Sequence, residues 1–291
     1  MKLSIITINY NNAAGLKKTL DSVASQICTD FEHIIVDGAS TDGSVDIIRE
    51  YENTLAFRLS PLASRLKWLS EPDTGIYNAM NKGVRLAQGE YTLMLNSGDY
   101  LVDEHVIAKV IPLLDGTDII QGNTVSVINK KEIINRGYAK SNISFIDVMK
   151  GHFLHQASFC RRILFDIYGM FDESYRINGD TVFYANCLAF GDATFRYVDV
   201  NIAFFDTTGI SMDPEGKWSR LRKEEDERHK AKHHECKCIV KHEHCNHNGK
   251  HKEDVLYKVR KNLRKHHRDR VGIVRHTCNE LTYGHMIELR V

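Results

Sequence analysis

The most restrictive feature of the chain is the regular alternation of apolar runs and helical patterns over residues 3–114. Short apolar runs rich in β-branched residues predict buried strands at residues 3–10, 31–36, 66–69 and 90–95. The patterns that follow these runs predict helices at residues 13–26, 44–51, 76–87 and 103–114. Buried strands that alternate with helices form βαβ units. We therefore expect a Rossmann-like α/β fold, with a mixed, mainly parallel sheet flanked by helices.

Polar side chains follow each predicted strand. Asn9, Asp37 and Asp73 stand at or just after three strand ends, and Asn96-Ser97-Gly98-Asp99 follows the fourth. In open parallel sheets, ligands bind in a crevice at the carboxyl ends of the strands. These side chains are therefore expected to line one ligand crevice.

The middle of the chain is less regular. Residues 118–128 and 131–138 are expected to form a hairpin, and residues 195–205 two further strands around Asp199. A strand is predicted at residues 157–160, and helices are predicted at residues 143–150, 161–168, 181–190 and 217–235.

Charge divides the chain into two regions. Residues 222–291 hold 18 Lys and Arg against 11 Asp and Glu, whereas residues 1–221 hold 21 against 27. This step predicts a main domain at residues 1–221 and a basic, His-rich, mainly helical C-terminal extension at residues 222–291.

Hydropathy bears on the compartment. No run reaches the roughly 18 apolar residues of a membrane span, and the apolar run at residues 3–8 is too short for a signal peptide. We therefore expect a cytoplasmic protein.

Four segments resemble nucleotide-sugar glycosyltransferases of family 2, which share the fold called GT-A. They are SIITINYN (4–11), IVDGASTDGS (35–44), EPDTGIYNAMNKG (71–83) and GEYTLMLNSGD (89–99). The likeness continues more weakly through residues 155–157, 178–180 and 209–211, and does not cover the last 70 residues. It is greatest to members that build bacterial cell-surface polysaccharides and exopolysaccharides.

The resemblance implies transfer of a sugar from a nucleotide-diphosphate sugar, with a UDP-sugar favoured, to a glycan or polyprenyl-linked acceptor. Residues 1–100 would form the nucleotide-binding half of the domain and residues 101–221 the acceptor half. A catalytically inactive module that binds nucleotide sugars or a partner is the alternative, because single acids stand at 99 and 180 where the family usually has pairs.

Seven residues are candidates for nucleotide-sugar binding, and three of them, Asn9, Asp37 and Lys82, also have an ordinary structural reading. Asp37 matches the family position that contacts the base, but an Asp there also caps a turn. Lys82 offers a cation to a phosphate or is a solvated surface lysine. The full set is Thr7, Asn9, Asp37, Asp73, Asn81, Lys82 and Asn96.

A divalent cation, Mn²⁺ or Mg²⁺, is expected at Asp99, because magnesium often takes only one or two protein carboxylates together with substrate phosphates. Asn96 replaces the first acid of the family's Asp-x-Asp motif and is expected to contact a ribose instead. His155 is a candidate second ligand, and its alternative is a hydrogen-bonded core histidine. The turn at residues 96–99 could also bind no ligand.

Asp180 is the candidate catalytic base. It matches the family position of the acid that takes the acceptor proton in an inverting transfer. Its structural alternative is an N-cap for the following helix.

The C-terminal extension contains two segments of interest. The His- and Cys-rich stretch at residues 233–247 has irregular spacing for zinc and is either a metal site or a solvated connector. Residues 255–265 predict a basic amphipathic helix that lies on the inner face of a membrane or docks on protein. Nucleic-acid binding is not expected, since the extension has few aromatic residues. An oligomer is compatible with the sequence.

Overall fold

The computed structural model describes residues 1–58, 60–128, 130–138, 143, 147–148, 153–209 and 217–232. The chain divides into two compact units, residues 1–245 and 246–291, and all of the second lies outside the described residues. The expected helix at 143–150, the His- and Cys-rich stretch and the 255–265 segment also fall largely or wholly outside them. No helix in the described ranges is long and apolar enough to cross a membrane.

Four parallel strands form the first half of the sheet, as predicted. They lie in the order β3-β2-β1-β4, with no antiparallel pair among them. Their bounds are β1 Leu3–Asn9, β2 Phe31–Asp37, β3 Leu66–Ser70 and β4 Tyr91–Met94.

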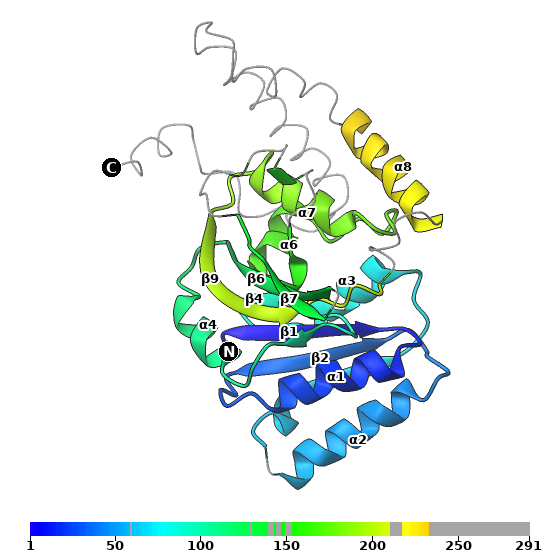
Figure 1. Ribbon diagram of the computed structural model, residues 1–291, viewed down its shortest axis with the longest axis vertical. Coiled ribbons are helices and arrows are strands. Elements are labelled where there is room, and N and C mark those ends of the chain that lie inside the picture. Colours follow the sequence, from blue (N-terminus) through cyan, green and yellow to red (C-terminus); the bar gives the residue numbers. More distant parts are fainter. Residues whose placement is uncertain are drawn as a thin grey trace, which may run out of the picture. The chain divides into compact units, whose positions relative to one another are not determined.

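Strand alternation assigns the helices to the two faces of this half. Leu3 and Ile5 pack in one cluster with Leu16 and Leu20 of α1, whereas Ile6 meets Gly83 of α3 on the opposite face. Figure 1 shows α1 and α2 side by side along the sheet. The helices are α1 Ala13–Ala24, α2 Ser44–Phe57 and α3 Ile76–Leu86.

The second half of the sheet is mixed. The order continues β4-β8-β6-β9-β5, and β7 pairs with β6. β8 is antiparallel to both β4 and β6, so β4 and β6 run in the same direction. The bounds are β5 Tyr100–Leu101, β6 Ile119–Ile128, β7 Lys131–Asn135, β8 Ser158–Arg161 and β9 Phe195–Phe204.

Further helices lie between these strands, and α8 follows the last of them. The α-helices are α4 Val106–Val110, α6 Ile163–Tyr168, α7 Gly179–Leu188 and α8 Lys217–Lys232. Short 3₁₀ turns are η1 Ala63–Arg65, η2 Ile111–Leu113 and η3 His155–Ala157.

One strand prediction was wrong. Residues 195–204 form the single strand β9 and not two strands around Asp199. Asp199 does not break the strand because its side chain is exposed and forms an ion pair with Arg136 at 2.8 Å. The irregularity lies in the partner strand β6, whose register shifts on either side of Asn123.

Candidate active site

Asp37 joins the ends of three neighbouring strands. Its fully buried carboxylate accepts hydrogen bonds from Asn9 Nδ2 at 2.8 Å, Ser40 Oγ at 2.6 Å and Ser70 Oγ at 2.7 Å, and from the Ser40 backbone N–H. Burial raises the pKa of Asp37, but these hydrogen bonds outweigh it and hold the pKa below its usual value. Asp37 therefore stays ionised and holds together this edge of the sheet.

Three neighbours of Asp37 complete this edge. Asn9 Oδ1 is buried and has no hydrogen-bond partner among the described residues. Tyr10 is 67% exposed and lies beside Gly38. A Cβ at Gly38 would approach Asp73 Oδ2 to 2.5 Å and the Tyr10 ring to 3.1 Å. The edge thus offers an unused acceptor, an open aromatic face and the Asp73 carboxylate.

Thr7 lies deeper than its neighbours. Its buried hydroxyl is 3.0 Å from His33 Nε2, and His33 Nδ1 is 3.0 Å from the hydroxyl of Tyr51 on α2. Burial lowers the pKa of His33 to about 3. The Thr7 side chain therefore belongs to a neutral core network, and a contact to a nucleotide would use its backbone.

Asn81 and Lys82 are engaged with neighbouring loops. Asn81 Nδ2 donates to the Phe171 carbonyl and to Glu173, and its Oδ1 accepts from the Phe171 N–H. Lys82 Nζ contacts the Pro72 carbonyl and Glu71, each at 2.8 Å. Either residue would have to exchange a protein contact to bind a phosphate.

Asp99 has a second carboxylate beside it. The Asp206 backbone N–H donates to Asp99 Oδ1 at 2.8 Å, and a Cβ at Gly98 would lie 2.5 Å from Asp206 Oδ2. Gly98 has a φ of 106°, which disfavours any residue with a side chain. Burial, with a contribution from the charge of Asp206, raises the pKa of Asp99 to about 7. The two acids therefore form a carboxylate pair across Gly98.

A continuous contact path links this pair to the candidate base. His155 Nδ1 is 3.0 Å from Asp180 Oδ2, and its Nε2 is 3.2 Å from Asn96 Nδ2. Burial lowers the pKa of His155, but the hydrogen bond and charge of Asp180, with the charge of Asp99, outweigh it and raise the pKa. The strand end at residues 96–99 and the start of α7 thus meet at one histidine.

The orientation of the Asn96 amide corresponds to the protonation state of His155. With Nδ2 donating to Nε2, His155 is neutral and carries its proton on Nδ1, facing Asp180. Asn96 Oδ1 is then buried and unpartnered. Rotating the amide would let Oδ1 accept from a doubly protonated ring. His155 can bind a metal only if Nε2 exchanges Asn96 for it.

Asp180 lies in the first turn of α7. Its Oδ1 accepts from the Thr181 N–H at 2.8 Å and contacts the Tyr77 hydroxyl at 3.1 Å. Burial raises the pKa of Asp180, but the hydrogen bond and charge of His155 outweigh it, and the pKa is lowered. Asp180 is therefore an ionised carboxylate in contact with His155. It is not the N-cap that its structural alternative required, because α7 begins at Gly179 with Asn178 as its N-cap.

Helix α8 holds the segment that precedes Asp180. The Glu225 carboxylate is 4% exposed and accepts three consecutive backbone N–H groups, of Arg176 at 2.6 Å, Ile177 at 3.1 Å and Asn178 at 3.0 Å. The Ile177 carbonyl accepts the Tyr77 hydroxyl. Glu225 thus fixes the turn from which α7 starts.

The carboxylate pair fits a divalent cation by its donor chemistry. Oxygen ligands suit Mg²⁺ and Mn²⁺, and one or two carboxylates suffice when substrate phosphates complete the shell. A cation would also relieve the burial of Asp99 and the charge of Asp206 beside it. The described residues contain no group of three or more His, Cys, Asp or Glu placed to hold a metal, so Asp99 and Asp206 would need ligands from the substrate.

Sequence reasoning missed Asp206 and Tyr77. Asp206 follows the apolar end of β9 and could have been found by the same strand-end rule that selected Asp99. Tyr77 reaches Asp180 across 103 positions in the sequence, and no local pattern indicates that contact.

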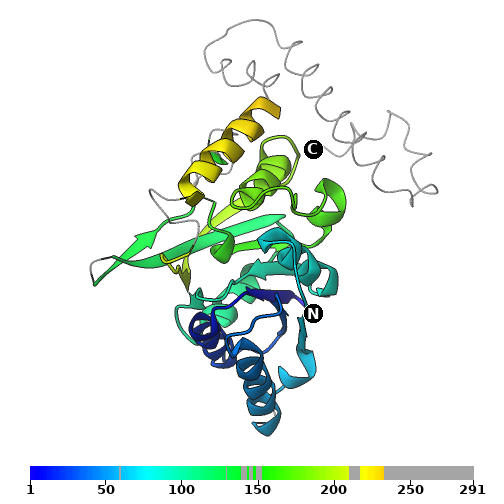
Figure 2. The same ribbon diagram turned by 90° about the vertical axis from the view of Figure 1, so that its right-hand side faces the viewer.

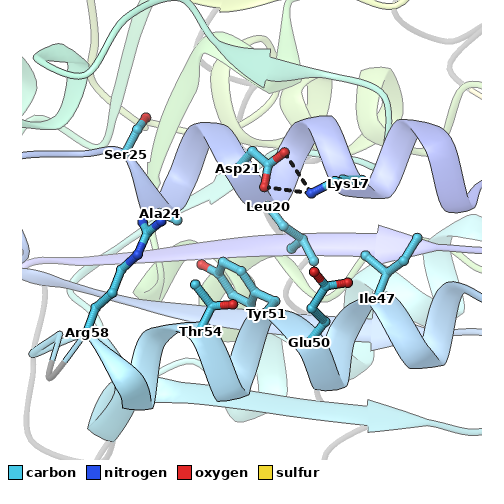
Figure 3. A pocket seen from close by; sticks show the side chains of 10 residues that line it. All are labelled: Lys17, Leu20, Asp21, Ala24, Ser25, Ile47, Glu50, Tyr51, Thr54 and Arg58. Atoms are coloured by element: carbon cyan, nitrogen blue, oxygen red, sulfur yellow. Dashed lines mark hydrogen bonds and ion pairs between the residues drawn. The ribbon is translucent and has the colours of Figure 1, made fainter.

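A groove between α1 and α2 lies apart from these residues. Figure 3 shows an ion pair between Lys17 and Asp21 on its α1 side. The ten lining residues include none of the strand-end side chains described above. Its lining is Lys17, Leu20, Asp21, Ala24, Ser25, Ile47, Glu50, Tyr51, Thr54 and Arg58. The groove is therefore separate from the strand-end side chains.

Solved structures share this fold. TarS of S. aureus, in complex with UDP-GlcNAc, superposes with a TM-score of 0.56 at 20% identity, over 70% of this chain and 58% of that one. A mannosyltransferase from Pyrobaculum calidifontis, in complex with GDP-Man and Mn²⁺, gives 0.57 at 20% identity, over 79% and 63%. The chain thus spans less than two thirds of each of these proteins. At this identity the likeness confirms the expected GT-A fold alone.

Sequence relatives identify the family. Residues 4–171 match the family described as glycosyl transferase family 2. A PGL/p-HBAD biosynthesis glycosyltransferase of Mycobacterium bovis is 34% identical over 209 residues, which are 71% of this chain and 77% of the relative. An uncharacterized glycosyltransferase of Mycobacterium tuberculosis is 30% identical over 227 residues, which are 76% and 82%. The chain is therefore a glycosyltransferase that belongs to family 2, as its four strand-end motifs predicted.

Proposed function

We propose that this glycosyltransferase moves a sugar, with inversion, from a UDP-sugar to a hydroxyl group of a glycan or lipid-linked acceptor. The observation that carries the proposal is the contact path from Asn96 through His155 to Asp180. The Asp99 backbone N–H joins this path by donating to the Asn96 carbonyl at 3.0 Å. Residues 96–99 thus lie on one side of His155, and the ionised Asp180 carboxylate lies on the other.

The nucleotide would occupy the Asp37 edge. The unpartnered Asn9 Oδ1 can accept an N–H of the base or a ribose hydroxyl, and the exposed Tyr10 ring offers a stacking face. Asp73 lies across Gly38 from Tyr10 and would bind the ribose. These contacts suit the nucleoside part of a UDP-sugar, and they require no cationic side chain at the nucleobase.

The diphosphate would lie over Gly98, between Asp99 and Asp206. A bound Mn²⁺ or Mg²⁺ would neutralise the charge that develops on the leaving diphosphate. The absence of a Cβ at Gly98 keeps the space under Asp206 Oδ2 open for close approach.

Asp180 would act as the base. As the acceptor oxygen bonds to the anomeric carbon, the bond from that carbon to the phosphate oxygen breaks, and its electron pair leaves with the nucleoside diphosphate. The acceptor proton passes to Asp180. His155 keeps Asp180 ionised and aimed before the reaction, since its Nδ1–H holds Oδ2.

Asp180→Asn is the decisive variant, with Asp46→Asn on the exposed face of α2 as its control. The amide keeps the size of the side chain but cannot take a proton, so kcat should fall by about 100-fold or more. UDP affinity, measured by calorimetry, should stay within about twofold of the parent. Turnover equal to that of the control would rule out Asp180 as the base.

The donor and the stereochemistry need separate measurements. Thermal-shift screening of UDP-, GDP-, dTDP- and CMP-sugars with Mn²⁺ should give the largest shift for a UDP-sugar. Proton NMR of the first product formed should show the anomer opposite to that of the donor. A nucleotide-dependent shift without transfer or donor hydrolysis would instead favour the inactive module.

A further inference from the structure

The β6–β7 hairpin carries an unusual set of exposed aliphatic side chains. Val127, Ile128, Ile133 and Ile134 are between 43% and 50% exposed. β6 pairs with β9 only as far as Val125, and within the described residues β7 pairs only with β6. Figure 2 shows the hairpin extending beyond the neighbouring strands. We call these four residues the hairpin tip.

The tip is apolar on both of its faces. Val127 stands opposite Glu132 and Val125 opposite Ile134, so Val127 and Ile134 share one face. Ile128 stands opposite Lys131 and Ser126 opposite Ile133, so Ile128 and Ile133 share the other. A folded protein partner would normally cover one face or the free edge, whereas a fluid hydrocarbon phase can surround both.

Charge and area also favour a lipid surface. Lys130 and Lys131 are exposed at the end of the hairpin, beside a single acid, Glu132. Lysines next to apolar residues suit anionic headgroups, because their stems lie along the apolar region while the ammonium stays in water. The area that four half-exposed aliphatic side chains can bury is far smaller than the roughly 1,000 Å² that a stable protein interface buries.

The position of the hairpin connects it to the site. β6 and β4 run in the same direction, so the hairpin leaves the sheet at the edge that carries residues 96–99. Where the hairpin joins the sheet, the Phe205 N–H donates to the Val125 carbonyl at 2.8 Å. Phe205 directly precedes Asp206. A surface that held the tip would therefore lie next to the carboxylate pair.

We propose that the hairpin tip inserts into an anionic membrane at the boundary between headgroups and hydrocarbon, and brings the strand ends at residues 96–99 to the lipid surface. Membrane contact through the tip is distinct from contact through residues 255–265, and it does not require that the proposed transfer be correct. Lys130 and Lys131 favour anionic lipids, and the aliphatic residues around them determine how deeply the tip inserts.

The test uses the full chain and vesicles of phosphatidylcholine with about 30% phosphatidylglycerol. The fourfold variant Val127→Ser, Ile128→Ser, Ile133→Ser, Ile134→Ser should lose about tenfold or more in vesicle binding by co-sedimentation. Replacing one face alone, Ile128→Ser with Ile133→Ser, should give a partial loss. The control Ile163→Ser with Ile167→Ser removes two similarly exposed aliphatics from α6 and should bind as the parent does.

A second measurement locates the tip. The Ile128→Trp variant should gain fluorescence quenching by brominated lipid relative to the parent, which contains only Trp68 and Trp218. Three results would each overturn the proposal: vesicle binding unchanged in the fourfold variant, no added quenching at position 128, or a chain dimer in light scattering that the fourfold variant abolishes without any vesicle binding. Loss of sugar transfer with vesicle binding intact would count against the proposed function and leave membrane insertion standing.

Discussion

Protonation of His33 should set the acid stability of the domain. The ring is fully buried between Thr7 and Tyr51, and burial lowers its pKa from 6.5 to about 3. Below pH 6.5 the unfolded chain binds a proton that the folded chain does not, so stability falls as the pH drops from 6.5 towards 3. The difference amounts to about 2 kcal/mol at pH 5 and up to about 5 kcal/mol over the whole window.

Urea unfolding at pH 8 and pH 5 measures this effect. In His33→Gln the side chain stays polar but does not titrate, so the loss of unfolding free energy between the two pH values should shrink by about 2 kcal/mol relative to the parent. His105→Gln is the matched control, since the His105 side chain is 52% exposed. The same pH dependence in His33→Gln and the parent would refute a neutral, buried His33 as the cause.

Further predictions concern the carboxylate pair and helix α8. Gly98→Ala places a Cβ against Asp206 at a positive φ, and urea melts should show about 1–3 kcal/mol lower stability. Asp206→Asn should abolish the extra thermal shift that Mn²⁺ gives with UDP, and retention of that shift would remove Asp206 from the cation site. Glu225→Gln sets an amide against backbone N–H groups and should lower both kcat and the unfolding free energy, the latter by about 1.5–3 kcal/mol. Glu224→Gln, on the exposed side of α8, should stay within about 0.5 kcal/mol of the parent.

The first half of the fold was predictable because three of its four strands, β1, β2 and β4, are buried along their whole length. Such strands are continuous apolar runs, and their polar ends stand out against them. Asp37 and Asp99 were selected on that basis. Asp37 is the last residue of β2, Asp99 lies in the turn after β4, and both are buried. The nucleotide and metal roles given to these residues remain predictions.

The second half was harder to predict because its polar side chains are satisfied by contacts between strands, which the local sequence does not reveal. Asp199 looked like a break, but Arg136 and Asn123 satisfy its carboxylate within one continuous strand. The end of this strand was predicted at residue 205, one residue from its observed end, but the strand-end rule was not applied to Asp206. The partnership of His155 with Asp180 was also missed, because the two lie 25 positions apart and meet only through the packing of η3 against α7.

The contact between Asp99 and Asp206 has a consequence for the order in which the site appears as the protein is made. The two residues lie 107 positions apart, and β5, next to Asp99, pairs only with β9 among the described strands. Contacts between residues so far apart in the sequence form late in folding. The chain between them must first be ordered, at a cost in conformational entropy. A nascent chain can therefore form the Asp37 edge from its first strands, while the cation edge must await β9.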